Sequence, residues 1–188
     1  MNHPVFFDYK NSLNLYGLEK SFKFLADIYR KKKFPKVLLL TGNKGCGKST
    51  LVNHFLFSIF DKKNYDEKNL TLLKTSNLSE QFKNNSYTNV IHINGSDFKA
   101  VSIDDIRNLK NKIFKTTISD FDRFIILDDI ELFNINSLNA LLKIIEEPSK
   151  KNYFIIIYNQ SKPLLETIRS RSLELKIFLS EASRIKII

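Results

Sequence analysis

Apolar residues fall along the chain in two recurring patterns: short runs of neighbouring apolar side chains, and longer segments in which they recur at helical spacing. Three of the short runs are continuous, which is typical of strands covered on both faces of a parallel sheet. The longer segments repeat an apolar side chain every three or four residues, which predicts amphipathic helices. The predicted strands are 37–40, 90–93, 124–127, 153–158 and, with a weaker pattern, 173–178. The predicted helices are 18–29, 50–60, 102–114 and 135–145.

Strands that alternate with helices in this way predict a doubly wound α/β fold, here a five-stranded parallel sheet with helices on both faces. Residues 61–89 interrupt the alternation, because they are polar, weakly patterned and rich in Lys, Asn and Ser. We predict that they form a long surface excursion with a short helix near Leu78. Residues 180–182 have the composition of a helix start, and the chain stops at Ile188 within about two turns of it, which suggests a truncated product or a fragment.

The composition fits one folded domain and excludes several classes of protein. The chain has 188 residues, enough for one full-sized domain and the start of another. Its 43% of hydrophobic residues excludes a wholly disordered chain, and its longest apolar runs are too short to cross a bilayer. The N-terminus lacks the layout of a signal peptide, so we expect a cytoplasmic protein. A single cysteine, Cys46, excludes a disulfide framework and a cysteine-rich zinc site.

The net charge is +10, from 30 Lys and Arg against 20 Asp and Glu. Such an excess favours partners that carry phosphate, because clustered cations release counterions from nucleic acid. A compositional drift toward lysine, as AT-rich coding produces, explains the same excess equally well. The charge therefore leaves both interpretations open.

The segment 42–49 reads G-N-K-G-C-G-K-S, a complete phosphate-loop motif that follows a predicted strand and opens a predicted helix. Its glycines allow the backbone to approach a polyphosphate with amide N–H groups pointing inward, and the next helix adds its positive end. We predict that Lys48 places a positive charge between the β- and γ-phosphates and that the Ser49 hydroxyl binds Mg²⁺. The residues predicted to bind ATP from this segment are Gly42, Asn43, Lys44, Gly45, Cys46, Gly47, Lys48, Ser49 and Thr50.

A P-loop protein also needs an acidic residue at the end of a neighbouring strand, and the predicted strand 124–127 is followed by two aspartates. We predict that Asp128 helps to hold Mg²⁺, usually through water, and that Asp129 lies where a base polarises the attacking water. A solvated strand end is the alternative for such a pair taken alone.

Three further motifs are N-A-L-L-K at 139–143, E-E-P at 146–148 and S-R-S at 170–172. Together with the phosphate loop they resemble the AAA+ ATPase domain of sliding-clamp loaders. The last motif reads S-R-C in that family, so Ser172 is a mild departure from the pattern. The resemblance implies a P-loop NTPase that binds ATP and Mg²⁺.

The same resemblance implies roles for residues that the local pattern does not single out. Tyr16 stands where the family places an aromatic residue against the adenine. Asn159 stands at the first sensor, where a side-chain amide orients the attacking water and contacts the γ-phosphate. Arg171 matches the arginine that reaches the nucleotide of a neighbouring subunit, and the planar guanidinium suits that contact. With Asp129, the last two form the predicted catalytic set, although a bare S-R-S alone indicates only a surface arginine.

The resemblance covers nearly the whole chain and implies its organisation and partners. It predicts a nucleotide-binding domain over 1–178 and the incomplete start of a helical lid over 179–188. It also predicts that the partners are the other clamp-loader subunits of a hetero-oligomeric ring, the sliding clamp and primer-template DNA. By the same analogy, the helix around Lys143 faces DNA.

Within the family, the chain resembles the delta-prime subunit of bacterial DNA polymerase III more than the gamma/tau subunits. The gamma/tau subunits carry a four-cysteine zinc module after the phosphate-loop helix, where this chain has the polar stretch 61–89. The opening His3 and Pro4 and the pair of aspartates at 128 and 129 also favour delta-prime. The sequence leaves the choice between these subunits open.

One departure from the family bears on catalysis. The family's usual acid pair is Asp followed by Glu, so the Asp129 carboxylate falls about an ångström short of where glutamate would hold water. Our hypothesis is that ATP binds but is hydrolysed slowly or not at all at this site. The alternatives are an active ATPase of the gamma/tau type, a non-catalytic stator that presents Arg171 to a neighbour, and another AAA+ machine such as a helicase loader.

Overall fold

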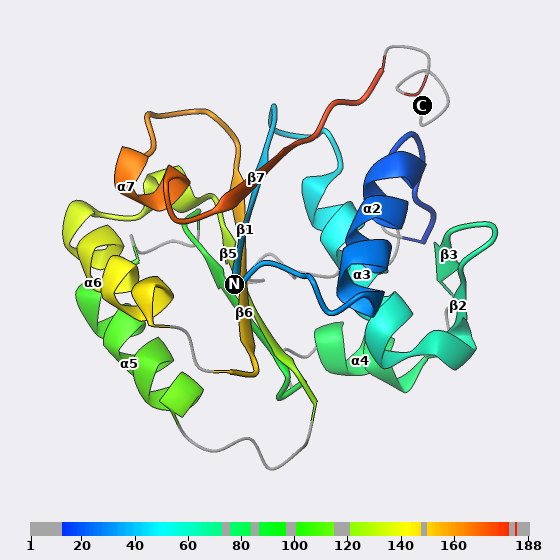
Figure 1. The fold of residues 1–188 in the computed structure, drawn as a ribbon, viewed down its shortest axis with the longest axis horizontal. Helices are drawn as coiled ribbons and strands as arrows, with labels where there is room; N and C mark the ends of the chain where they lie inside the picture. Colours follow the sequence, from blue (N-terminus) through cyan, green and yellow to red (C-terminus); the bar gives the residue numbers. More distant parts are fainter. Residues whose placement is uncertain are drawn as a thin grey trace. The chain divides into compact units, whose positions relative to one another are not determined.

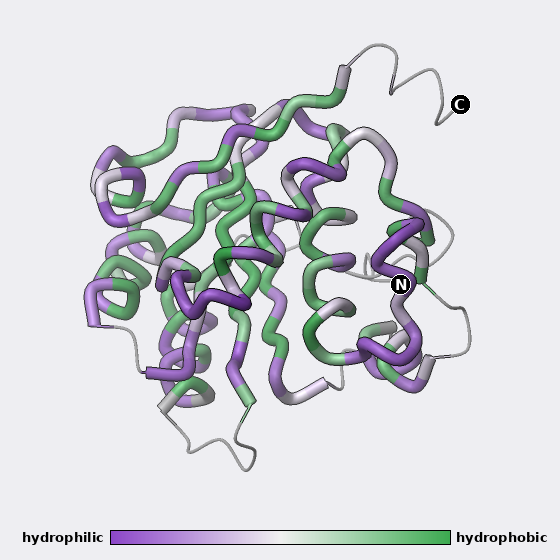
Figure 2. Tube along the Cα trace, turned by 45° about the vertical axis from the view of Figure 1, so that its right-hand side comes forward, coloured by the Kyte–Doolittle hydropathy of each residue, from purple (hydrophilic) through white to green (hydrophobic). Residues whose placement is uncertain are grey.

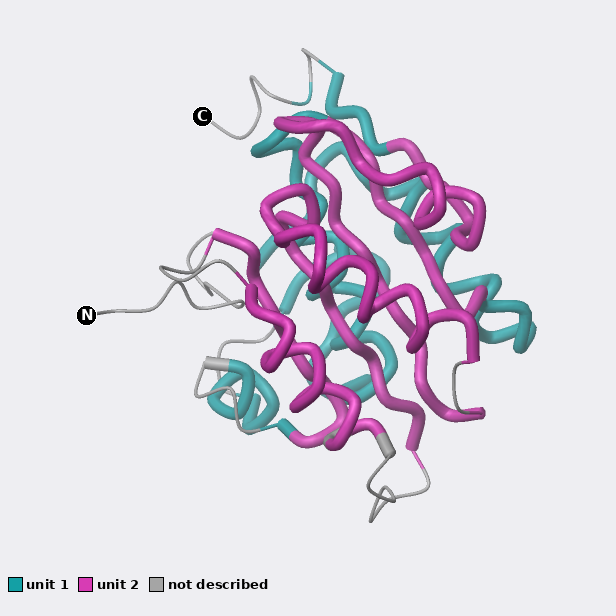
Figure 3. The backbone as a smooth tube through the Cα atoms, turned by 90° about the vertical axis from the view of Figure 1, so that its left-hand side faces the viewer, with its two compact units in different colours: residues 1–34, 43–87, 177–188 teal, residues 35–42, 88–176 magenta. Residues whose placement is uncertain are grey.

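The computed structural model describes residues 13–72, 76–83, 87–96, 101–114, 121–147, 150–180 and 183. They belong to two compact units, which Figure 3 draws in two colours. Unit 1 comprises residues 1–34, 43–87 and 177–188, and unit 2 comprises residues 35–42 and 88–176. Along the chain, the border between the units therefore falls inside the phosphate loop, between Gly42 and Asn43.

Unit 2 contains a five-stranded parallel sheet with the strand order β4-β5-β6-β1-β7 (Figure 1). The first strand along the chain lies between the last two, which requires crossover connections. The strands are β1 (Val37–Thr41), β4 (Val90–Asn94), β5 (Arg123–Asp128), β6 (Asn152–Tyr158) and β7 (Leu173–Lys176). The predicted strands and the α/β fold with a five-stranded parallel sheet are confirmed, although β7 ends at Lys176 rather than at 178.

Helices of unit 2 pack on one face of this sheet. They are α5 (Ile103–Phe114), η2 (Ile130–Leu132), α6 (Ile135–Glu146) and α7 (Glu166–Arg169). Alternate strand residues such as Leu39, Ile125 and Ile156 form one buried cluster with apolar residues of these helices. The residues between them, such as Ile126 and Ile155, are fully buried as well, which explains why the runs are continuous rather than alternating. The strands are coloured mostly as hydrophobic in Figure 2.

Two hydrogen-bonded caps fix where the long helices of unit 2 begin. Helix α5 follows the predicted capping box, in which Ser102 N donates to the Asp105 carboxylate (2.8 Å) and Asp105 N donates to Ser102 Oγ (3.2 Å). Helix α6 follows Asn134, whose side-chain oxygen accepts from Ser137 N (2.8 Å). The Asn134 amide also donates to the Val101 carbonyl (2.7 Å), so the start of α6 is tied to the segment that leads into α5.

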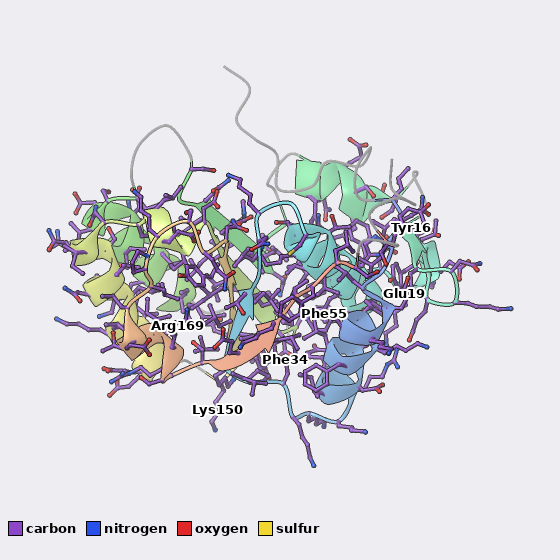
Figure 4. All side chains as sticks on the ribbon, turned by 90° about the horizontal axis from the view of Figure 1, so that it is seen from above. Tyr16, Glu19, Phe34, Phe55, Lys150 and Arg169 are labelled. Atoms are coloured by element: carbon purple, nitrogen blue, oxygen red, sulfur yellow. The ribbon has the colours of Figure 1, made fainter. Side chains whose placement is uncertain are left out.

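Unit 1 is built around helix α3 (Lys48–Phe60), which begins at the end of the phosphate loop. Helix α2 (Glu19–Arg30) packs against it. The ring of Phe55 stacks on Phe34 with 5.1 Å between centroids and meets Tyr29 edge-on at 5.8 Å; Figure 4 labels the first two rings. The other elements of this unit are η1 (Lys62–Asn64), β2 (Tyr65–Asp66), β3 (Thr71–Leu72) and α4 (Asn77–Lys83).

The prediction of a surface excursion over 61–89 is wrong in part. The described residues of this stretch include an antiparallel pair, β2 and β3, and several buried side chains. Burial raises the pKa of the Tyr65 hydroxyl, which lies 3.2 Å from Nδ1 of the buried His54. Single apolar residues among polar ones have no period, so the sequence pattern could not reveal which of them are buried. The predicted short helix near Leu78 is confirmed as α4. Among the described residues of the stretch, the buried apolar ones are Tyr65, Leu70, Leu72, Leu78 and Phe82.

Some predictions concern residues outside the described ranges. These are His3, Pro4, Pro148 and most of the expected lid start at 179–188, of which positions 179, 180 and 183 are described. The domain boundary at 178 therefore stays a prediction.

Candidate nucleotide-binding site

The phosphate loop connects the end of β1 to the first turn of α3, as the motif predicts. Gly47 caps the helix in the left-handed region, with φ of 85°, which a residue with a Cβ rarely adopts. A Cβ added there would lie 3.1 Å from Cδ1 of Leu18, so space as well as backbone conformation favours glycine. The shape of the loop therefore depends on its backbone, and Asn43 and Lys44 are exposed.

Lys48 is the buried centre of this loop, with only 3% of its surface exposed. Its ammonium donates to the Asn43 carbonyl at 2.8 Å and lies 3.5 Å from Sγ of Cys46. The Cys46 N–H donates to the same carbonyl at 3.3 Å, which closes the turn around the ammonium. The loop thus holds one positive charge on its inner side, next to Ser49 and Thr50, which are partly exposed on the first turn of α3.

Tyr16 belongs to the same unit as the loop and has 48% of its surface exposed. It precedes Gly17, whose N–H donates to Oε1 of Glu19 at the start of α2 (2.9 Å; Figure 4 labels Tyr16 and Glu19). Leu18, two positions on, is the residue that packs beside Gly47. Unit 1 therefore places the Tyr16 segment next to the phosphate loop, and its contact with adenine stays a prediction.

A cluster of acidic side chains lies in unit 2, where β5 ends. The Asp128 carboxylate accepts from Asp129 N at 2.9 Å and lies 3.9 Å from Nε2 of His92 on the neighbouring strand β4. Asp129 is buried and has a left-handed backbone, with φ of 50°, which is uncommon outside glycine and marks a tight turn. Gly95 closes this turn, because its N–H donates to the Asp128 carbonyl (2.9 Å) and a Cβ on it would meet the Asp129 carbonyl oxygen.

Asn159 follows β6, the strand next to β5, and its amide nitrogen donates to Oδ1 of Asp129. Parallel strands end at the same edge of a sheet, so residues thirty positions apart meet there. The structure thus brings together Asp128, Asp129 and Asn159, which the sequence predicted separately.

Glu131 and Ser161 complete this cluster, and the sequence analysis missed both. Glu131 is 6% exposed, and its Oε1 accepts from Asn159 N (3.0 Å), Ser161 N (3.2 Å) and Ser161 Oγ (2.9 Å). Neither residue had a signal in the sequence, because a single acid and a single serine have no pattern that predicts burial. We call the five residues Asp128, Asp129, Glu131, Asn159 and Ser161 the acid–sensor cluster.

Arg171 lies after α7 and is tied to the end of α6. Its guanidinium forms an ion pair with Oε1 of Glu146 at 2.8 Å and donates to the Thr167 carbonyl at 3.1 Å. The two paired side chains are 39% and 47% exposed, so Arg171 lies on a surface of unit 2. Its predicted contact with the nucleotide of a neighbouring subunit stays a prediction.

A basic hollow of about 310 Å³ lies between α5 and α6 in unit 2. Its polar lining comes from three cations and two amides, while isoleucines and an alanine form the rest. Arg107 pairs with Asp104 at 2.9 Å on the exposed side of α5. The polar lining residues are Arg107, Lys110, Asn136, Asn139 and Lys143.

A complete phosphate-loop motif between a strand and a helix, next to a parallel sheet that ends in acidic residues, defines a P-loop α/β domain. The fold is similar to that of a DNA polymerase III gamma subunit-related protein from Thermotoga maritima, with a TM-score of 0.61 and 19% identity over 87% of this chain and 48% of that chain. It is similar to the RuvB Holliday junction branch migration motor of the same organism, with a TM-score of 0.61 and 16% identity over 96% of this chain and 53% of that chain. These likenesses show the fold.

The chain belongs to the family described as DNA polymerase III, delta subunit, which it matches over residues 17–179. It is 29% identical over 168 residues to the DNA polymerase III subunit delta' of Buchnera aphidicola subsp. Baizongia pistaciae, covering 85% of this chain and 49% of the relative. It is 27% identical over 156 residues to the DNA polymerase III subunit tau of Bacillus subtilis, covering 82% of this chain and 27% of the relative. The predicted resemblance to delta-prime, with gamma/tau relatives beside it, is confirmed. The chain spans about half the length of the first of these relatives.

Within the described part of the chain, no helix combines the length and the apolar character needed to span a membrane.

Proposed function

We propose that this chain is an ATP-binding clamp-loader subunit of the delta-prime type, which helps to load the sliding clamp onto primed DNA during replication in the cytoplasm. The main support is the phosphate loop, whose left-handed Gly47 and buried Lys48 give one positive charge inside a turn of backbone amides. Family membership over residues 17–179 supports the replication role.

The residues present fit ATP and Mg²⁺. The hydroxyl of Ser49 and the carboxylate of Asp128 are hard oxygen ligands of the kind that Mg²⁺ prefers. When bound, Mg²⁺ would neutralise charge on the phosphates, and the Lys48 ammonium would add a further positive charge from the loop. Tyr16 is exposed and free to stack on a base.

Asp129 and Asn159 are proposed to act on water and on the γ-phosphate. The Asp129 carboxylate already accepts a hydrogen bond from Asn159, and its side chain is shorter than the glutamate of the family pattern. Both features leave it poorly placed to draw a proton from a further water molecule, because a general base must lie within hydrogen-bond reach of that proton. We therefore expect ATP binding with slow hydrolysis at this site.

The proposed partners are the other clamp-loader subunits, the clamp and primer-template DNA. Arg171, on the surface and away from the cluster, would contact the nucleotide of a neighbouring subunit. Lys143, Arg107 and Lys110 in the basic hollow would contact DNA phosphates, the sequence-independent part of nucleic-acid binding. A non-catalytic stator would share the Arg171 role but would not need the buried Lys48, and an active gamma/tau-type ATPase would turn over ATP.

The test measures binding and hydrolysis separately. We expect Mg-ATP at a hundredfold excess over its Kd to stabilise the protein against unfolding by about 2.7 kcal/mol. Lys48→Ala should abolish this gain, since the loop then lacks its positive charge. Lys23→Ala, which removes an exposed lysine of α2 in the same unit, should keep it. A thermal shift that is equal in both variants would mean that ATP does not occupy the loop.

Single-turnover hydrolysis then separates the alternatives. Tight binding with little product supports the delta-prime-like proposal, whereas turnover at the rate of an active AAA+ ATPase supports the gamma/tau type. Failure of the unsubstituted protein to bind ATP at all supports the stator.

A further inference from the structure

Glu131 is a buried acid that the proposed chemistry does not use. It lies in the short η2 turn between the acidic end of β5 and the start of α6, with 6% of its surface exposed. One carboxylate oxygen accepts three hydrogen bonds, all from the segment that follows β6: Asn159 N, Ser161 N and Ser161 Oγ, at 3.0, 3.2 and 2.9 Å. The other oxygen, Oε2, is buried and has no hydrogen-bond partner among the described residues.

The two backbone amides that donate hydrogen bonds to Glu131 belong to the residues on either side of Gln160. This residue has a left-handed backbone, with φ of 60°, which costs about 1–2 kcal/mol for a residue other than glycine. A left-handed residue between two amides turns both N–H groups toward one point, which makes a small anion-binding concavity in the backbone. The Glu131 carboxylate occupies that concavity and so stabilises the conformation that Gln160 adopts.

The segment 159–161 also contacts Asp129, the acid in the turn after β5. Asn159 donates its backbone N–H to Glu131 and its side-chain amide to Asp129, so both ends of this residue are held by acids from one turn. Asp129 itself is left-handed, with φ of 50°. Two loops with left-handed residues, which follow neighbouring strands, are therefore joined through the buried carboxylates of Glu131 and Asp129.

A packing role alone does not account for a glutamate at this position. Burying a carboxylate costs free energy unless hydrogen bonds compensate it, and one oxygen here lacks such a bond among the described residues. An apolar side chain of similar size could be buried at this position without that cost. What the carboxylate supplies, and an apolar residue cannot, is the three accepted hydrogen bonds.

We propose that Glu131 is a positioning residue that holds the 159–161 segment in place and so keeps the Asn159 side chain beside Asp129. The functional part of this inference rests on the proposed function, because it is Asn159 that would distinguish ATP from ADP by contact with the γ-phosphate. Without Glu131, the Asn159 amide loses its fixed position, while residues 43–48 of the phosphate loop, which belong to unit 1, keep their own hydrogen bonds.

The direct test needs no nucleotide. Amide hydrogen exchange of Asn159 and Ser161 is measured by NMR in the full chain and in its variants. We expect Glu131→Ala to accelerate exchange at both amides by about tenfold or more, because each loses a buried acceptor. Glu131→Gln should keep most of the protection, since its carbonyl oxygen can occupy the place of Oε1. The control is Glu166→Gln, which changes a carboxylate that is 88% exposed and should leave both amides unaffected.

Ser161→Ala is the milder variant in case Glu131→Ala fails to fold. It removes one of the three donors and leaves both amides bonded, so we expect a smaller acceleration, confined to residues 159–161. Unchanged exchange at both amides in Glu131→Ala, or in Ser161→Ala where only that variant folds, would overturn the inference.

The functional readout is the ratio of ATP affinity to ADP affinity, measured by titration calorimetry. We expect Glu131→Ala to weaken ATP binding about tenfold and ADP binding little, with Glu131→Gln restoring most of the ratio. An equal loss for both nucleotides would indicate a general structural defect and would overturn the positioning role. If the unsubstituted protein binds neither nucleotide, the proposed function fails, and the exchange of the two amides alone decides whether Glu131 holds the segment.

Discussion

The phosphate loop and the acid–sensor cluster hold their polar groups in opposite ways. The loop is one continuous piece of chain, and its geometry comes from the backbone, with a left-handed Gly47 and a carbonyl of Asn43 that faces the Lys48 ammonium. The cluster is assembled from the ends of two neighbouring strands, and side chains link its parts: Glu131 and Asp129 from one side, Asn159 from the other. Substitutions should therefore damage the loop through conformation and the cluster through lost hydrogen bonds.

Gly47→Ala tests whether the phosphate loop depends on its backbone conformation. We expect it to lower stability more than the loss of a single side-chain hydrogen bond in unit 2. A left-handed residue with a Cβ costs about 1–2 kcal/mol, and the contact with Leu18 at 3.1 Å adds to it. Urea unfolding should show a loss of stability of that order, and ATP binding should weaken as the loop changes shape.

The companion variant is Gly47→Ala combined with Leu18→Ala, which makes room for the added Cβ. If the backbone conformation is the main cost, the double variant recovers little of the ATP affinity. Stability and ATP binding equal to those of the unsubstituted protein in Gly47→Ala would refute the backbone account of the loop.

Asn159→Ala tests the cluster with a smaller expected effect. It removes the side-chain hydrogen bond to Asp129 but keeps the hydrogen bond from the backbone N–H to Glu131, so we expect a stability loss of about 1 kcal/mol. ADP affinity should stay the same, because the loop is unchanged, while ATP affinity falls. Calorimetric titrations with both nucleotides measure the two affinities. An equal fall in ADP affinity would show that the acid–sensor cluster does not act separately from the phosphate loop.

The same contrast explains how much the sequence could predict. The position of the phosphate loop between a strand and a helix was predictable, because its residues are contiguous and form a motif with a known local structure. The strands of the sheet were predictable because apolar runs such as Phe124 to Leu127 are buried on both faces. The clustering of Asp129 with Asn159 was predictable only through family resemblance, since it depends on which strands are neighbours.

Other features had no readable signal. The strands β2 and β3 are two residues long each, too short for a period, so Tyr65 and Leu72 gave no pattern. Glu131 looks like any surface acid in the sequence, because its burial is decided by the loop after β6 rather than by its own neighbours. Glu146, the partner of Arg171, lies at the end of α6, whereas Arg171 follows α7, and only the fold brings the two together.

Glu146→Gln has the smallest expected effect on stability. It tests whether an exposed carboxylate contributes less than a buried one such as Glu131. In its ion pair with Arg171, the arginine side chain is 39% exposed and the glutamate side chain 47% exposed. Exposed ion pairs contribute about 0–1 kcal/mol to the stability of a protein. We expect a stability loss of at most about 0.5 kcal/mol at low salt, which disappears at high salt because ions screen exposed charges. Glu166→Gln, whose carboxylate lies 3.8 Å from Arg169 and is 88% exposed, is the matched control and should change stability even less.

The functional arm of this test uses the assembled complex. If Arg171 acts on a neighbouring subunit, releasing it from Glu146 should change the ATPase rate of the complex by about twofold at most, since an exposed ion pair restrains the side chain weakly. Arg171→Ala should lower the same rate far more, because it removes the charge itself. A loss in Glu146→Gln as large as that in Arg171→Ala would mean that the pair, rather than the free guanidinium, is the active arrangement, and that exposed and buried carboxylates in this unit have the same kind of positioning role.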